Sequence, residues 1–238
     1  MPSSAVEDYL KAIHGLASGP DAASTSAIAE RLGIAAGSVT GMLKRLAEQG
    51  LVEHVPYYGA RLTDLGEHEA VRLIRRHRVL ELFLVKVLGY TWDRVHEEAE
   101  RLEHTATDEL IDRMASVLGG PAADPHGAPI PASRGRFIEW HYPTLGEVQV
   151  GTRGVLRRVQ DEDAEALRYL AQMELVPGVE VEVLERAPFN GPLKLQVAGQ
   201  ERFLGAELAR SLEIEPADES TPRRKKVKPK AVGGSKHV

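Results

Sequence analysis

The fold is decided by the stretch SAIAERLGIAAGSVTGMLKRLAEQGLVEHV, which spans residues 26–55. Its first part predicts a helix that Ser24 or Thr25 caps and that Gly33 ends, because glycine readily adopts the left-handed conformation that closes a helix. A second helix is predicted over residues 38–50, with apolar side chains along one face. Two helices separated by a tight turn form a helix-turn-helix.

The sequence on either side completes a larger unit. Residues 4–18 have apolar side chains at helical spacing, and residues 51–63 predict a hairpin of two short strands. Three helices followed by a hairpin predict a winged helix-turn-helix domain over residues 1–63. In such domains the third helix enters the major groove of double-stranded DNA. The candidate DNA-binding residues are Ala35, Ala36, Gly37, Ser38, Thr40 and Lys44 around this helix and Arg61 in the hairpin.

The remaining chain divides into three further parts. Long helices are predicted over residues 64–88 and 92–118 and are followed by a Pro/Gly-rich linker, so that residues 64–131 form a helical domain. Residues 148–215 alternate apolar and polar side chains, which predicts a small all-β domain interrupted by one short helix. Residues 216–238 predict a disordered basic tail. The expected fold class is therefore α+β and multidomain.

The composition excludes several classes of protein. The chain of 238 residues has 42% hydrophobic and 27% charged residues and no long apolar run, so a cytoplasmic protein is expected and an integral membrane protein is not. The absence of cysteine excludes disulfides, thiol nucleophiles and cysteine-type zinc sites. The net charge is −5, but residues 221–238 carry seven Lys or Arg and no acid, which leaves −12 on the rest.

Six imidazole and carboxylate groups on the two long helices have the spacing of metal ligands. Two lie four residues apart on the first helix, and four lie at offsets of 0, 4, 7 and 8 on the second, so each set follows one helical stripe. Such ligands together suit manganese, iron(II), zinc, cobalt or nickel. A solvated helix face paired with Arg94 and Arg101 is the alternative. The six residues are His77, Glu81, His96, Glu100, Glu103 and His104.

The same segment does not match a zinc protease. Position 100 would have to be the second histidine of that motif, and Glu100 stands there. Surface positions or hydrogen-bonded roles are expected for five other histidines, namely His14, His54, His68, His126 and His141.

Together these motifs resemble the diphtheria toxin repressor family of metal-dependent transcriptional regulators. The resemblance covers residues 1–215 and implies a winged-helix domain, a helical dimerisation and metal-binding domain, and a C-terminal SH3-like barrel. Its strongest stretches are EDYLKAIH (7–14), IAERLGIAAGSVTGMLKRLAEQGLV (28–52), HRVLELFLVKVLGY (77–90), VHEEAERLEH (95–104) and PHGAPIP (125–131).

The resemblance also implies a primary and an ancillary metal site. Positions 8 and 100 carry carboxylates where the iron-responsive branch has a methionine and a cysteine, which implies a preference for Mn²⁺, with Fe²⁺ second. Lys11 stands where the manganese branch has a further carboxylate, which argues against a binuclear site. The implied ligands are Asp8, Glu100, Glu103 and His104 at the primary site and His77, Glu81, His96 and Asp163 at the ancillary site, with Glu162 or Glu165 as alternatives to Asp163.

The resulting prediction is a metal-dependent repressor of metal-uptake genes that binds a double-stranded DNA operator as a homodimer. A divalent ion would draw Asp8 of the first helix toward the ligands of a later helix and so orient the recognition helices. Neither a membrane nor a small organic substrate is expected as a partner, and no enzymatic activity is expected. Two other hypotheses stay open: a metal-dependent hydrolase, and a metal-independent winged-helix regulator or protein-interaction module.

Overall fold

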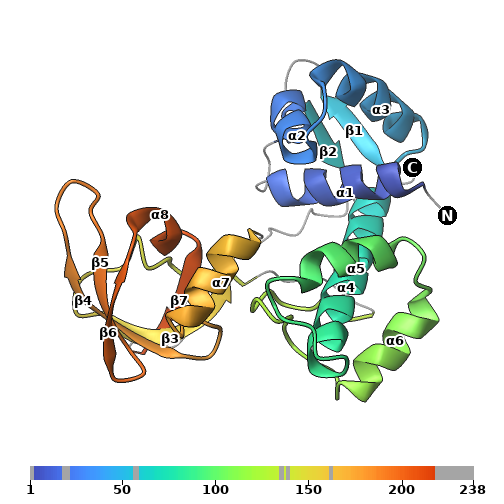
Figure 1. Ribbon diagram of the computed structural model, residues 1–238. Coiled ribbons are helices and arrows are strands. Elements are labelled where there is room, and N and C mark those ends of the chain that lie inside the picture. Colours follow the sequence, from blue (N-terminus) through green and yellow to red (C-terminus); the bar gives the residue numbers. More distant parts are fainter. Residues whose placement is uncertain are drawn as a thin grey trace, which may run out of the picture.

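The computed structural model describes residues 3–17, 22–55, 59–133, 137, 140–160 and 163–217. Figure 1 shows three parts: a helical part with a two-stranded hairpin, a second helical part built on the long helix α4, and a twisted sheet. Helix α4 packs against α1 of the first part and against α5 of the second. Among the described residues, none of the helices has the length and apolar content that a bilayer span requires.

The N-terminal part has the elements of a winged helix-turn-helix. The Ser24 hydroxyl caps the second helix by accepting from the Ala27 amide, and Gly33 ends that helix at a φ of 63°. The third helix begins at Ala36, earlier than predicted, and its cap residue Ala35 offers no side-chain hydrogen bond. The elements are α1 (Ser4–Leu16), α2 (Thr25–Leu32), α3 (Ala36–Glu48), β1 (Val52–Val55) and β2 (Gly59–Leu62).

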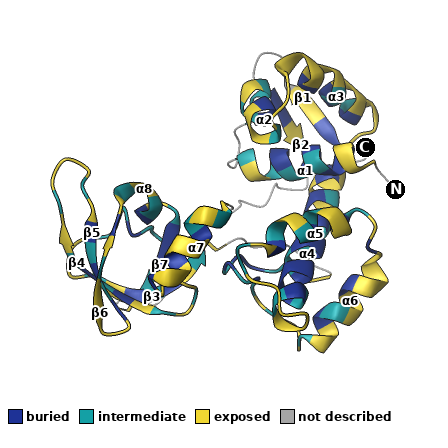
Figure 2. Ribbon diagram, in the orientation of Figure 1, coloured by how far each residue is buried: buried dark blue, intermediate teal, exposed yellow. Residues whose placement is uncertain are grey.

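One apolar face of each of these helices forms a shared core. Each large aliphatic side chain that folding buries contributes about 1.5–3 kcal/mol, so this core holds α1 and α3 as one unit. The outer side of α3 is exposed (Figure 2). The fully buried side chains include Leu10, Ile13, Ile28, Val39, Leu43 and Leu46.

The second part consists of α4 (Asp64–Lys86), α5 (Val95–Glu103) and α6 (Asp108–Val117). The first long helix is confirmed, but the single helix predicted over residues 92–118 is wrong. Thr107 leaves the helical conformation at a ψ of 152° and caps α6, where its hydroxyl accepts from a backbone amide. The break lets α5 and α6 each pack separately on α4.

The C-terminal part is an antiparallel sheet with the strand order β6-β5-β4-β3-β7. The alternating pattern predicts its first three strands and the helix between them, although the first strand starts at Arg153 rather than at residue 148. The alternating pattern does not predict the last three elements, which have five, four and five residues. The elements are β3 (Arg153–Val159), α7 (Ala164–Gln172), β4 (Glu180–Arg186), β5 (Leu193–Val197), β6 (Gln200–Leu204), α8 (Ala206–Ala209) and β7 (Leu212–Pro216).

The sheet encloses its own apolar core. Leu145, Leu156 and Leu195 are among its fully buried side chains, and Trp92 from the loop before α5 packs against it. The sheet part is therefore in contact with the helical part. The predicted disordered tail over residues 216–238 starts too early, because Pro216 belongs to β7, and residues 218–238 lie outside the described residues.

The Pro/Gly-rich stretch 121–131 is a folded loop rather than a free linker. Asp124 Oδ1 accepts from the His126 amide, and the His126 carbonyl oxygen accepts from the Val159 amide of β3. Gly127 has a φ of 88°, and a Cβ atom there would lie 1.8 Å from a backbone oxygen of β3. Only glycine permits this approach. The loop thus joins the sheet to the helical part.

Candidate metal centre and nucleic-acid interface

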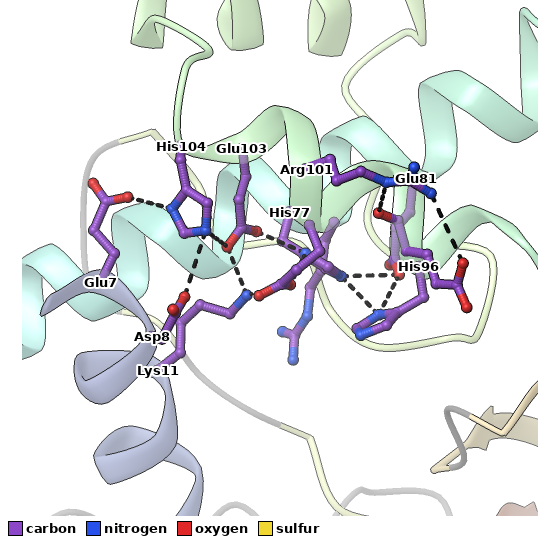
Figure 3. A network of polar contacts seen from close by, with 12 residues as sticks. Glu7, Asp8, Lys11, His77, Glu81, His96, Arg101, Glu103 and His104 are labelled. Carbon is purple, nitrogen blue, oxygen red and sulfur yellow. Dashed lines mark hydrogen bonds and ion pairs between the residues drawn. The ribbon is translucent and has the colours of Figure 1, made fainter. Parts of the chain in front are cut away.

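Two helices from different parts of the chain converge on one cluster of potential metal ligands. Asp8 lies on α1, Glu100 and Glu103 lie on α5, and His104 is the residue that ends α5. One ligand atom from each of these residues lies within 4.8 Å of the others. Figure 3 shows Asp8 directed from α1 toward His104, beside Glu103. The structure therefore brings together the four residues of the predicted primary site, which we call the primary cluster.

One oxygen of Asp8 indicates that a cation suits this cluster. Its Oδ1 atom is buried and accepts no hydrogen bond from the described residues, although His104 Nε2 lies 3.4 Å away. Burial raises the pKa of Asp8, and the opposing effect of His104 does not cancel the increase. A buried carboxylate oxygen is unfavourable unless a donor or a positive charge faces it. Three carboxylates and one imidazole fit a divalent cation at this point.

A further carboxylate on α1, Glu7, holds the ring of His104. Glu7 Oε2 lies 2.6 Å from His104 Nδ1, and the Glu7 side chain is only 3% exposed. When Nδ1 donates to Glu7, the Nε2 atom on the side of Asp8 is left to bind a cation. Sequence analysis missed Glu7, because adjacent residues of a helix point in different directions and spacing alone did not select it.

Glu103 is fully buried and contacts two potentially cationic side chains. Lys11 Nζ lies 2.7 Å from Glu103 Oε1 and 2.8 Å from Glu100 Oε2, and His77 Nδ1 lies 2.7 Å from Glu103 Oε2. Burial raises the pKa of Glu103, but His77 and Lys11 lower it by more, so the net shift is downward. An ionised Glu103 thus connects α1, α4 and α5.

A second cluster continues from His77 along α4 and α5. His77 Nε2 lies 3.0 Å from Glu81 Oε1 and 3.1 Å from His96 Nδ1. Burial lowers the pKa of His77, but hydrogen bonds to Glu103 and Glu81 raise it to about 9. The pKa of Glu81 is well below its ordinary value, because hydrogen bonds from His126, His77 and His96 outweigh burial. The predicted ancillary residues His77, Glu81 and His96 therefore meet.

A third group meets Glu81 from the folded loop, and sequence analysis did not assign it. Ligand atoms of Glu81, Asp124 and His126 lie within 4.8 Å of one another. His126, which was expected at the surface or in a hydrogen bond, is only 9% exposed. Its Nε2 atom lies 2.9 Å from the carbonyl oxygen of Trp92. The spacing of Asp124 and His126, two residues apart in the sequence DPH, was the available signal.

The structure places Asp163, the ligand predicted from the sheet domain, at the start of a helix. Asp163 is the N-cap of α7, where its Oδ1 accepts from the amides of Glu165 and Ala166. It belongs to none of the three clusters described above. Its alternative Glu162 lies outside the described residues.

The predicted DNA-binding residues are all exposed. Val39 and Leu43 of α3 are buried, whereas the residues from Ala35 to Ser38, and Thr40 and Gly41, are exposed. Small side chains at the start of α3 allow a close approach to a DNA groove, and the exposed cations can meet phosphates. The exposed residues are Ala35, Ala36, Gly37, Ser38, Thr40, Lys44 and Arg61.

Known domain families match three successive parts of the chain. They are the iron-dependent repressor N-terminal DNA-binding domain (residues 1–60), the iron-dependent repressor metal-binding and dimerisation domain (63–132) and the FeoA domain (144–216). The iron-dependent repressor IdeR of Mycobacterium leprae is 30% identical over 223 residues, which cover 88% of this chain and 96% of that protein. The chain belongs to the diphtheria toxin repressor family. The diphtheria toxin repressor of Corynebacterium diphtheriae is itself 26% identical over the same shares of the two chains, 88% and 96%.

The similarity to known repressors also holds for the fold. A manganese-dependent transcriptional repressor in complex with manganese has a TM-score of 0.82 and 38% sequence identity, and the match covers 89% of this chain and 99% of that one. The predicted fold class is thereby confirmed, with an N-terminal helix-turn-helix domain, a helical metal-binding and dimerisation domain and a C-terminal SH3-like domain.

Proposed function

We propose that this chain is a Mn²⁺-dependent, DNA-binding transcriptional repressor of metal-uptake genes, with Fe²⁺ as the second activating ion. One observation carries the proposal: Asp8 of α1 meets Glu100, Glu103 and His104 of the α5 region. The similarity to a manganese-dependent repressor solved with manganese supports the choice of ion.

The primary cluster couples cation binding to the position of the DNA-binding domain. Asp8 moves with α3, because α1 and α3 share one core. Glu100 and Glu103 lie on α5, which packs on α4. Lys11 offsets part of the charge of Glu100 and Glu103, but Asp8 still faces these two carboxylates across this junction, and they repel one another. A bound divalent ion supplies the positive charge that offsets this repulsion. Asp8 and His104 then hold α1 against α5, which sets the direction of α3.

The donor atoms favour Mn²⁺ among the physiological metals. The primary cluster offers three carboxylates and one imidazole, and the chain has no cysteine that could supply a thiolate. Oxygen-rich sites suit Mn²⁺, whereas thiolates select softer metals. Fe²⁺ accepts the same oxygen and nitrogen donors and is the second choice.

Exposed apolar side chains on the helical domain support a homodimer. Val87 and Leu88 at the end of α4 are 48% and 59% exposed, and Leu110 and Val117 of α6 are 44% and 70% exposed. A second copy that covers these side chains would remove them from water. It would also present two α3 helices to half-sites about 34 Å apart on double-stranded DNA.

The direct test is DNA binding measured against metal concentration. A duplex enriched from a random library with the Mn²⁺-loaded protein serves as the probe, and fluorescence anisotropy is recorded with Mn²⁺, Fe²⁺, Zn²⁺, Co²⁺ or EDTA. We expect saturable DNA binding with Mn²⁺ at its physiological free concentrations, and weak binding in EDTA. Equal binding with Mn²⁺ and EDTA would instead indicate a metal-independent regulator.

We also infer that the metal centre regulates and does not catalyse. The family consists of repressors, and the proposed ion would use all four residues of the primary cluster as ligands, which leaves none of them as a general base. Hydrolysis of ester, peptide and phosphoester substrates by the Mn²⁺-loaded protein should equal the rate with Mn²⁺ alone. A rate above that background would support a hydrolase.

Glu7 offers a test of how the site is built. The Glu7→Gln variant is expected to weaken Mn²⁺ binding about 10- to 100-fold, because a neutral amide orients the His104 ring less firmly. Isothermal titration with Mn²⁺ measures the change, and Glu97→Gln, at a side chain 83% exposed, is the matched control. An unchanged Kd for Glu7→Gln would show that Glu7 does not position His104.

A further inference from the structure

Lys11 places a positive charge inside the primary cluster. It lies three residues after Asp8 on α1, so both side chains leave the helix on the same side (Figure 3). Its Nζ atom bridges Glu100 Oε2 at 2.8 Å and Glu103 Oε1 at 2.7 Å, and the side chain is 21% exposed. The ammonium group thus contacts two of the three carboxylates that would bind the ion.

The charges of the cluster balance around one divalent ion. Asp8, Glu100 and Glu103 contribute three negative charges, of which one divalent ion offsets two. The third needs a cation close by, because Glu103 is fully buried and water cannot screen it. The ammonium group of Lys11, which contacts both Glu100 and Glu103, supplies this charge together with the His77 ring, which contacts Glu103.

We propose that the ammonium group of Lys11 takes the place of a second metal ion, so that the primary cluster binds a single divalent ion with moderated affinity. The proposal rests on the proposed function. Two ions about 3.5–4 Å apart would have to share carboxylate oxygens, and Lys11 already contacts an oxygen of Glu100 and one of Glu103. The same contacts make Lys11 compete with the single ion.

Two substitutions at Lys11 test separately the affinity for Mn²⁺ and the number of Mn²⁺ ions bound. Lys11→Met keeps the length of the side chain and removes the charge. Mn²⁺ should therefore bind about 10- to 100-fold more tightly, with no change in the number of bound ions. Lys11→Glu adds a carboxylate, so the cluster should bind one more Mn²⁺ than the parent protein. Lys11→Arg keeps the charge and is the control, which should still bind a single ion.

The ions are counted by equilibrium dialysis and isothermal titration of the full chain with Mn²⁺. All proteins carry His96→Ala and His126→Ala, which remove one ligand each from the second cluster and from the group of Glu81, Asp124 and His126, so that the count reports the primary cluster. Electron paramagnetic resonance adds an independent readout, because two Mn²⁺ ions at this separation give an exchange-coupled spectrum. We expect an isolated-ion spectrum for the parent, Lys11→Met and Lys11→Arg, and a coupled spectrum for Lys11→Glu.

The outcomes distinguish this proposal from the proposed function. A parent protein that binds no Mn²⁺ would overturn the metal site itself. A parent that binds Mn²⁺ as a coupled pair would overturn only the role of Lys11. The same conclusion follows if the parent binds one ion and Lys11→Met leaves the affinity unchanged. The Lys11→Met result decides the matter even if Lys11→Glu fails to fold.

Discussion

Replacing both Glu103 and His104 by alanine is expected to make DNA binding independent of Mn²⁺. In the proposed metal site these residues supply two of the four ligands, and His104 also contacts Glu7 of α1. The coupling that is lost corresponds to about a 5- to 150-fold change in DNA affinity on adding metal. Gel shifts across a Mn²⁺ titration measure it, and size-exclusion chromatography checks that the dimer persists.

Glu103 also requires a control for stability. Its removal leaves Lys11 and His77 without their buried partner, which can cost about 3–5 kcal/mol of folding free energy. The single variant His104→Ala keeps Glu103 paired with Lys11 and His77, but it leaves the buried Glu7 without this partner, so its free energy of unfolding is measured as well. Glu97→Ala on the same helix should behave like the parent. A double variant that still responds to Mn²⁺ would refute the assignment of the primary cluster.

The second large effect is expected at Gly127, where the folded loop meets β3. An alanine Cβ would lie 1.8 Å from the Arg157 carbonyl oxygen, so the loop must move away from the sheet. We expect Gly127→Ala to lower the free energy of unfolding by about 3 kcal/mol or more, from left-handed strain and overpacking together. Chemical denaturation monitored by circular dichroism measures this loss.

Gly151 provides a matched control for that substitution. Its φ of 90° is close to the 88° of Gly127, but no atom lies within 4 Å of a Cβ built there. Gly151→Ala should therefore cost only the strain of the backbone, about 1–2 kcal/mol. Equal losses for the two variants would show that the contact between the loop and β3 does not stabilise the protein.

Local patterns in the sequence account for the winged helix and for most of the metal ligands. Ser24, Gly33 and the apolar spacing of residues 28–46 determine the helix-turn-helix through contacts within one short stretch. The stripe from His96 to His104 predicts ligands because they are neighbours on one helix. Such features depend on the residues nearby in the chain, which is why they can be predicted.

The remaining features depend on contacts between distant segments. Glu7, Asp124 and His126 join the clusters only because α1 and the folded loop pack against α4 and α5, and no spacing rule links them to His104 or Glu81. The break between α5 and α6 depends on Thr107, which caps α6. The apolar spacing of this segment fits one continuous helix equally well, so the pattern alone does not predict the break.

The anomalous diffraction signal of Mn²⁺ in crystals of the full chain shows directly whether one ion joins α1 to the helical domain. We predict a peak bound by Asp8 of α1 together with Glu100, Glu103 and His104, so that one ion connects the DNA-binding domain to the helical domain. A peak held only by residues of the helical domain, with Asp8 outside coordination distance, would contradict the account.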